Sequence, residues 1–150
     1  MRIARSESEV EVIWVVLYDE RDGLVHGVLG ALFLGGAFEA IASCYSDHEV
    51  LADAFRSGEG IGWAEHDHRL FSGVERLFHP SYAVHLVDDW LPALDGVVDR
   101  LWAGGTVADI GCGLGTSTIL MAQAFERSTF TGLDLHEPSI ESARAAAARA

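Results

Sequence analysis

The sequence predicts an α/β fold in which a mainly helical N-terminal region is followed by the beginning of a parallel sheet. Apolar residues recur at helical spacing through much of the first hundred residues, whereas residues 106–150 alternate between short apolar strands and helical segments. The length of 150 residues allows one full compact core, since single domains hold roughly 100 to 200 residues. We therefore divide the chain into a helical region, 1–102, and an incomplete α/β region, 103–150.

The first elements are a short strand and two helices. Val10–Leu17 is rich in β-branched and apolar residues and predicts a strand. Leu29–Tyr45 and Glu49–Arg56 carry apolar residues at helical spacing and predict two helices. The second helix should end at Ser57–Gly60, a serine- and glycine-rich loop.

The middle of the chain has a weaker pattern. Residues 63–82 mix aromatic, charged and histidine side chains, which predicts short turns and loops. Pro80 should end any long helix there, because proline has no backbone N–H and collides with the preceding turn. Apolar residues from Trp90 to Leu101 share one helical face and predict a helix that ends at Ala103–Gly105.

The last third alternates regularly between strand and helix. We expect strands at Thr106–Ile110 and Thr129–Leu133, a helix at Thr116–Phe125, and a second helix from Pro138 to the last residue, Ala150. Strands that alternate with helices are typical of parallel sheets.

Composition narrows the classes of function. A net charge of −13 and a pI near 4.7 disfavour nucleic-acid binding, which depends on Lys and Arg. The apolar run Gly27–Phe38 is shorter than the roughly 20 residues that span a bilayer, so we expect no membrane segment. Cys44 and Cys112 lie far apart, and we expect both to be reduced thiols in the cytoplasm. Cys112 is explained by loop geometry rather than as a nucleophile.

A glycine loop with two carboxylates predicts a nucleotide-type ligand. Val107–Gly115 reads Val-Ala-Asp-Ile-Gly-Cys-Gly-Leu-Gly and joins a strand to a helix. Its glycines permit a tight turn and let a ligand approach bare backbone. Asp134 ends the next strand, where a carboxylate can accept hydrogen bonds from ribose hydroxyls. Asp109 before the glycines, and Thr116 at the sixth position of the motif, favour a cationic ligand over a pyrophosphate.

These motifs resemble the first two motifs of class I methyltransferases that depend on S-adenosylmethionine. The resemblance implies a Rossmann-like parallel sheet and S-adenosylmethionine as the cofactor. It places Asp109 near the methionine end, Gly111 and Gly113 against the cofactor, Gly115 at a close helix contact, and Asp134 on the ribose. It assigns no catalytic residue.

The resemblance extends upstream. Three upstream segments are similar to a group of actinobacterial methyltransferases with a winged-helix-like N-terminal domain: Phe55–Trp63, Glu65–His68 and Phe78–Tyr82. Members of that group use the N-terminal part for dimerisation and to cover the substrate pocket. The resemblance therefore implies a homodimer and a small-molecule acceptor. Class I methyltransferases build a seven-stranded sheet, so we expect this chain to be a truncated or partial copy that need not be active.

Two other classes of function stay open. Residues up to Trp102 could form a non-catalytic helical interaction module that carries a Rossmann remnant. An NAD-binding domain is disfavoured by Asp109 and Thr116. The stretch Glu65–His68, with His79 and His85 after it, matches no standard metal spacing, so we predict no metal site. The suggestion that His66 or His68 acts as a catalytic base rests only on their position in the sequence.

Overall fold

The structure is a computed structural model that describes residues 2–5 and 26–150, with side chains described from residue 35 onward. Of these, residues 2–5 and 79–150 form one compact unit, which we call the sheet unit. Residues 26–78 form the other, which we call the helical unit. The strand predicted at Val10–Leu17 lies outside the described residues.

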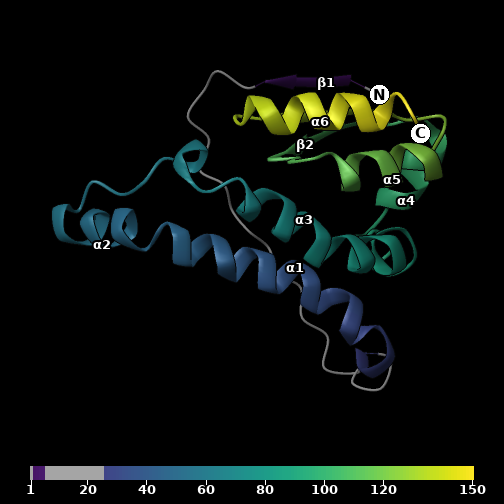
Figure 1. The fold of residues 1–150 in the computed structure, drawn as a ribbon. Coiled ribbons are helices and arrows are strands. Elements are labelled where there is room, and N and C mark those ends of the chain that lie inside the picture. Colours follow the sequence, from purple (N-terminus) through teal and green to yellow (C-terminus); the bar gives the residue numbers. More distant parts are fainter. Residues whose placement is uncertain (1, 6–25) are drawn as a thin grey trace. The chain divides into compact units, whose positions relative to one another are not determined.

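The sheet unit contains a parallel sheet, which confirms the predicted α/β fold class. Its described strands are β1 (Arg2–Arg5), β2 (Thr106–Ile110) and β3 (Thr129–Asp134), in the spatial order β1-β3-β2. Figure 1 labels β1 and β2 within this unit. The register pairs Val107 of β2 with Phe130 of β3. The strands β2 and β3 match the prediction, with β3 one residue longer.

Strand β1 was not predicted. It pairs in parallel with β3, from Arg2 opposite Thr131 to Arg5 opposite Asp134. The segment Arg-Ile-Ala-Arg is too short and too charged to show a strand pattern by itself. Its conformation follows from backbone hydrogen bonding to the edge of β3, which a local sequence pattern does not record.

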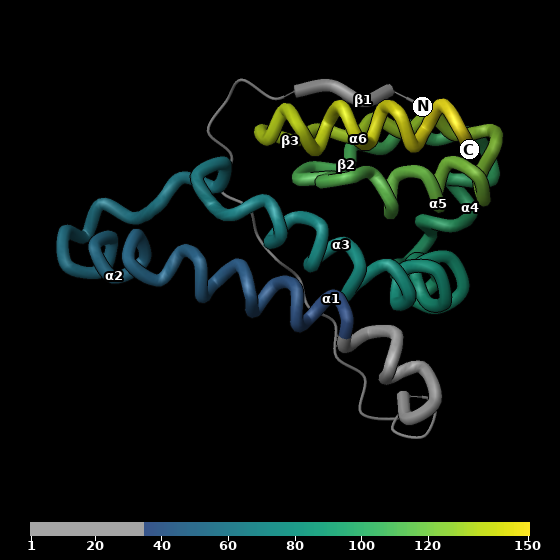
Figure 2. Tube along the Cα trace, viewed as in Figure 1, coloured from purple at the N-terminus to yellow at the C-terminus, as the bar shows by residue number. Residues whose placement is uncertain are grey.

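Two helices pack against this sheet. Helix α5 (Thr116–Ala124) follows β2, and α6 (Glu137–Ala147) follows β3 (Figure 2). Pro138 lies in the first turn of α6, where its missing N–H has no helical partner to lose. The expectation that this helix continues to Ala150 is wrong, because the chain closes into tighter turns after Ala147, with Arg149 N donating to Ala146 O at 3.0 Å.

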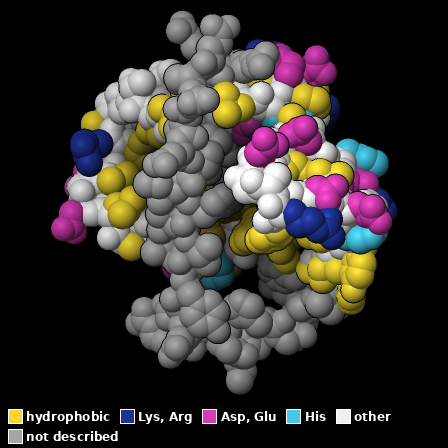
Figure 3. Space-filling view, turned by 90° about the vertical axis from the view of Figure 1, so that its left-hand side faces the viewer, with side chains coloured by type: hydrophobic (Ala, Val, Ile, Leu, Met, Phe, Trp, Pro, Cys, Tyr) yellow, Lys and Arg dark blue, Asp and Glu magenta, His cyan; other side chains and the backbone are white. Residues whose placement is uncertain are grey.

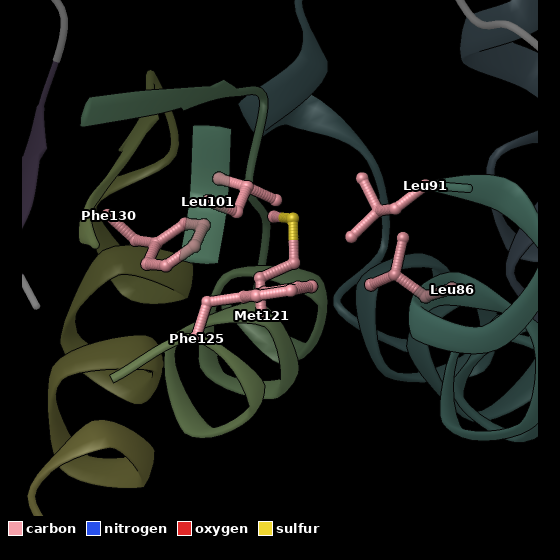
Figure 4. Close-up of a cluster of buried hydrophobic side chains, with 6 residues drawn as sticks. All are labelled: Leu86, Leu91, Leu101, Met121, Phe125 and Phe130. Carbon is pink, nitrogen blue, oxygen red and sulfur yellow. The ribbon is translucent and has the colours of Figure 1, made fainter. Parts of the chain in front are cut away.

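The core of the sheet unit joins helices and strand through apolar side chains. Its fully buried members include Phe125 at the end of α5 and Phe130 on β3, each 1% exposed. Leu86 and Leu91 face Met121 of α5 from the segment between α3 and α4 (Figure 4). This contact holds residues 82–91 against the helix that begins at the glycine loop.

Two predictions about the middle of the chain are wrong. Pro80 does not prevent a long helix: α3 (Arg69–Ser81) contains it in its last turn, and a π-helix, η3 (Tyr82–Trp90), follows directly. The chain accommodates the proline by widening the hydrogen-bond spacing downstream, and Leu91 N donates to Leu86 O at 3.0 Å.

The continuous helix predicted from Trp90 to Leu101 is also broken. Only α4 (Val97–Ala103) is regular, and turns precede it. Pro92 supplies no N–H to a continuing helix, and Gly96 adopts a left-handed φ of 67°. The apolar spacing across this region therefore reflects burial of separate turns rather than one helical face. The predicted end near Ala103 is correct.

The helical unit confirms the two predicted helices, α1 (His26–Ser46) and α2 (His48–Ser57), and adds a short 3-10 helix, η2 (Trp63–Glu65). Helices α1 and α3 touch backbone to backbone. A Cβ on Gly36 would lie 2.6 Å from the carbonyl oxygen of Gly73, and one on Gly73 would lie 2.6 Å from Ala40 N. Within the described part of the chain, each helix is too short or too polar to cross a membrane.

Candidate functional site

The glycine loop lies between β2 and α5 and takes a conformation that only glycine adopts without strain. Gly111, Gly113 and Gly115 have φ values of 77°, 53° and 85°. The loop is attached to the end of β3, because Gly111 N and Cys112 N both donate to the Leu133 carbonyl oxygen, at 2.7 and 3.0 Å. The loop therefore crosses the carboxyl ends of β2 and β3.

Two of the glycines have different surroundings. At Gly115 an added Cβ would lie 2.9 Å from Ala143 Cβ, so this glycine allows α5 and α6 to pack closely. At Gly113 an added Cβ would meet nothing within 4 Å. The backbone at Gly113 is therefore open to a ligand, whereas Gly115 serves the packing of the helices.

Asp134 is the last residue of β3 and is held by two backbone amides. Its Oδ2 accepts a hydrogen bond from Gly113 N at 2.8 Å, and its Oδ1 accepts one from His136 N at 2.8 Å. The first bond joins the carboxylate to the loop, and the second joins it to the residue that precedes α6. Each carboxylate oxygen has a second lone pair, so both can also accept a hydroxyl from a ligand.

Asp109 lies on β2 and is held by the first turn of α5. Its Oδ2 accepts hydrogen bonds from Ser117 Oγ at 2.7 Å and from Thr118 Oγ1 at 2.6 Å. Thr118 is fully buried, so this contact is shielded from water. The arrangement places a negative charge beside the N-terminal turn of α5, where an anionic ligand would otherwise bind.

The charges of Asp109 and Asp134 both affect the pKa of the Cys112 thiol. Burial raises the pKa of Cys112 to about 12, and the charges of Asp109 and Asp134 add to the shift. The two carboxylates therefore flank the loop and create a negative potential across it. A thiol with so high a pKa is a poor nucleophile, in agreement with the structural role expected for Cys112.

The sequence analysis missed several residues of this site. Ser117 and Thr118 were not singled out, although the hydroxyl-rich run that follows the last glycine was a usable signal. His136 was missed because its contribution is a backbone amide. Tyr82 of η3 was assigned no place beside the cofactor loop; burial, together with the charge of Asp109, raises the pKa of its hydroxyl.

His66 and His68, which were considered as metal ligands or bases, lie in the helical unit and have other partners. His66 Nδ1 lies 3.2 Å from Asp47 Oδ2, and both side chains are largely buried. His68 is exposed and lies 3.6 Å from the Asp67 carboxylate. Across residues 2–5 and 26–150, no group of three or more His, Cys, Asp or Glu side chains is arranged to hold a metal ion.

Comparison with known proteins identifies one related family. Residues 107–150 match the model of a family described as "Methyltransferase domain". No curated protein matches the chain. The matched range contains the glycine loop and both carboxylates, and it supports a methyltransferase in general.

Proposed function

We propose that the chain is a methyltransferase that binds S-adenosylmethionine at the glycine loop and transfers its methyl group to a small molecule. The observation that carries this proposal is the pair of ordered carboxylates, Asp109 and Asp134, on either side of a loop whose backbone is open at Gly113. A ligand that combines ribose hydroxyls with cationic centres fits this arrangement. The family match over residues 107–150 supports the same conclusion.

Each residue would hold a different part of the cofactor. Asp134 would accept the ribose hydroxyls, and Asp109 would lie near the ammonium of the methionine moiety. Gly111 and Gly113 would present bare backbone, while Gly115 keeps α5 and α6 close. The cofactor supplies a methyl group already activated on a sulfonium, so the contribution of the protein is mainly to align the acceptor with it.

An NAD-type pyrophosphate fits less well. Such ligands place their phosphates at the N-terminus of the helix that follows the loop. Here the Asp109 carboxylate accepts hydrogen bonds from Ser117 and Thr118, which lie in the first turn of α5. A pyrophosphate would meet this carboxylate at short range, and the repulsion between like charges would oppose its binding.

A thermal-shift experiment distinguishes the two ligands. A ligand that binds only the folded chain stabilises it by RT ln(1 + [L]/Kd), which is about 2.7 kcal/mol at a hundredfold excess over Kd. We expect S-adenosylhomocysteine to raise the unfolding temperature and NAD at the same concentration to leave it unchanged. Stabilisation by NAD alone would reject the methyltransferase assignment.

The composition of the chain supports a proposal for the class of methyl acceptor and for the cellular location. The net charge of −13 opposes contact with a phosphate backbone, which favours a small molecule over a nucleic acid as the methyl acceptor. Cys44 and Cys112 are both free thiols. We propose a cytoplasmic location on this basis.

We also propose that the helical unit forms a homodimer. Phe38, Ile41 and Tyr45 follow one another at helical spacing along α1 and are 65%, 51% and 76% exposed. Phe55 on α2 is 89% exposed. Figure 3, which looks from the α2 end, shows hydrophobic side chains at the surface beside charged ones. Exposed apolar patches of this kind are typical of protein interfaces.

Sedimentation velocity tests the homodimer. If the patch forms the interface, Ile41→Glu combined with Phe55→Glu should convert the dimer to a monomer. Ser57→Glu, an exposed change at the end of α2, should leave the dimer intact. A wild-type chain that sediments as a monomer at tens of micromolar would reject the proposal.

A further inference from the structure

We propose that the side chain of His136 caps the start of α6 and thereby orients the Asp134 carboxylate for its ligand. This inference rests on the proposed function and deepens it, because it adds a positioning residue to the ribose end of the proposed cofactor site. His136 acts through Asp134 rather than on the reacting atoms. Its effect is that the ribose hydroxyls meet a carboxylate that is already in place.

The two oxygens of Asp134 are held from different elements. Oδ2 accepts a hydrogen bond from Gly113 N in the loop, and Oδ1 accepts one from His136 N at the start of α6, each at 2.8 Å. The loop is itself attached to β3 through the Leu133 carbonyl oxygen. The orientation of the carboxylate therefore depends on where α6 begins, because that sets the position of the His136 amide.

His136 is the residue at which α6 begins. Its backbone is extended, with φ of −86° and ψ of 98°, and its carbonyl oxygen accepts a helical hydrogen bond from Ile140 N at 3.1 Å. Its ring Nδ1 lies 2.7 Å from Ser139 Oγ. Ser139 is 4% exposed, and Ile140 is fully buried. The backbone and the ring of His136 are thus both attached to buried residues at the start of the helix.

The contact between the ring and Ser139 takes the place of an ordinary helix cap. Most caps are short side chains, such as Ser, Thr, Asp or Asn, which accept a hydrogen bond from an amide of the first turn. Pro138 leaves the first turn of α6 with one backbone donor fewer for such a cap. The imidazole of His136 reaches a side-chain hydroxyl instead. A hydroxyl can both donate and accept, so it complements Nδ1 in either tautomer of the ring.

The start of α6 needs this anchor because helix ends lack the hydrogen bonds of the interior and open readily. The middle of the helix is fixed in another way, since Ala143 is fully buried and lies against Gly115. Without the cap, the His136 amide would move with the first turn, and Asp134 would keep the hydrogen bond from Gly113. A carboxylate with one restraint samples more orientations. The ligand must then order it, which lowers the affinity.

Calorimetry with S-adenosylhomocysteine on four variants of α6 tests the proposal. His136→Ala and Ser139→Ala each remove one partner of the contact, and we expect each to weaken binding about three- to tenfold. His136→Asn restores a strong N-cap residue and should recover most of the affinity. Ser142→Ala is the matched control: it removes an exposed hydroxyl that donates to Pro138 O at 2.9 Å on the same helix, and it should bind like the wild type.

A double-mutant cycle shows whether the effect passes through Asp134. In the Asp134→Ala background, His136→Ala should change the remaining affinity by less than about twofold, because the group that it orients is gone. A general loss of structure would weaken binding equally in both backgrounds. In the ligand-free chain, NMR should show faster exchange of the Gly113 amide, which donates to Asp134, in His136→Ala than in Ser142→Ala.

The outcomes separate this inference from the proposed function. If the wild type binds S-adenosylhomocysteine and His136→Ala binds it equally well, the inference is wrong and the cofactor site stands. An equal loss in the Asp134→Ala background, or no recovery in His136→Asn, would overturn the inference as well. If S-adenosylhomocysteine does not bind the folded wild-type chain, the proposed function fails and this inference fails with it.

Discussion

At the residue scale, the candidate site depends on a small set of hydrogen bonds that hold carboxylates in place. Asp134 is fixed by the amides of Gly113 and His136, and Asp109 is fixed by the hydroxyls of Ser117 and Thr118. A ligand would meet carboxylates that are already oriented. Less conformational entropy is then lost on binding than if the side chains had to be ordered by the ligand.

The buried hydroxyl of Thr118 should be important for stability. Thr118→Val keeps the shape of the side chain and removes the hydrogen bond to Asp109, which leaves a partly buried carboxylate oxygen with one partner fewer. We expect the free energy of unfolding in urea to fall by about 1–3 kcal/mol. Thr118→Ser retains the hydroxyl and should recover most of the part due to the hydrogen bond. Equal losses in both variants would show that packing, not the hydrogen bond, is responsible.

The two thiols should differ in reactivity. Burial and two neighbouring carboxylates raise the pKa of Cys112 to about 12, so only a very small fraction is thiolate near pH 8. Cys44 is exposed. Iodoacetamide at pH 8, followed by mass spectrometry, should modify Cys44 long before Cys112. Comparable rates in the native chain would contradict the buried, negative surroundings of Cys112.

At the element scale, the sequence predicted those parts of the fold that local patterns encode. The strands of residues 106–110 and 129–134 and the helices α1, α2, α5 and α6 were all recognisable from apolar spacing and glycines. Strand β1 was missed because its pairing with β3 is not local. The π-helix was missed because Pro80 was interpreted as a stop signal, whereas the chain changes its hydrogen-bond spacing and remains helical.

The candidate site was predictable to a similar extent. The sequence indicated the glycine loop and both acids because residue type and spacing carry that signal. It could not indicate which groups hold the acids, since Ser117, Thr118 and the His136 amide are chosen by the geometry of the turn that starts each helix.

The crossing of α1 and α3 should tolerate no added methyl group at its centre. In Gly73→Ala the new Cβ would lie 2.6 Å from Ala40 N and 2.9 Å from Gly36 O, and backbone atoms cannot move aside individually. We expect a loss of about 1–3 kcal/mol in the free energy of unfolding.

Gly35→Ala is the matched control for this crossing. Its Cβ would approach only the end of the flexible Arg76 side chain, at 3.0 Å. Alanine also favours a helix interior over glycine by about 1 kcal/mol. We therefore expect the control to be neutral or stabilising, and an equally destabilised control would contradict a specific backbone contact at Gly73.

At the scale of the whole molecule, the chain divides into two compact units with different proposed roles. The sheet unit contains the glycine loop and both carboxylates, whereas the helical unit carries the exposed apolar patch. The acidic charge of the whole chain is consistent with both roles, because neither requires contact with a polyanion.

Hydrogen exchange followed by mass spectrometry should resolve the two units. S-adenosylhomocysteine should slow exchange in peptides from residues 106–140, because ligand binding raises the free energy of opening there. Gly73→Ala should speed exchange in peptides from residues 35–57. Protection that is equal in both units on addition of the ligand would show that they open together, and would contradict the division of roles.

Isothermal titration of the purified chain with S-adenosylhomocysteine tests the central claim most directly. The account predicts saturable binding at one site per chain, weakened at least tenfold by Asp134→Ala and unchanged by Asp99→Ala, which removes an exposed carboxylate from α4. Circular dichroism on the same samples confirms that each variant is folded. Absence of binding by a folded wild-type chain, or binding that Asp134→Ala leaves unchanged, would contradict the account.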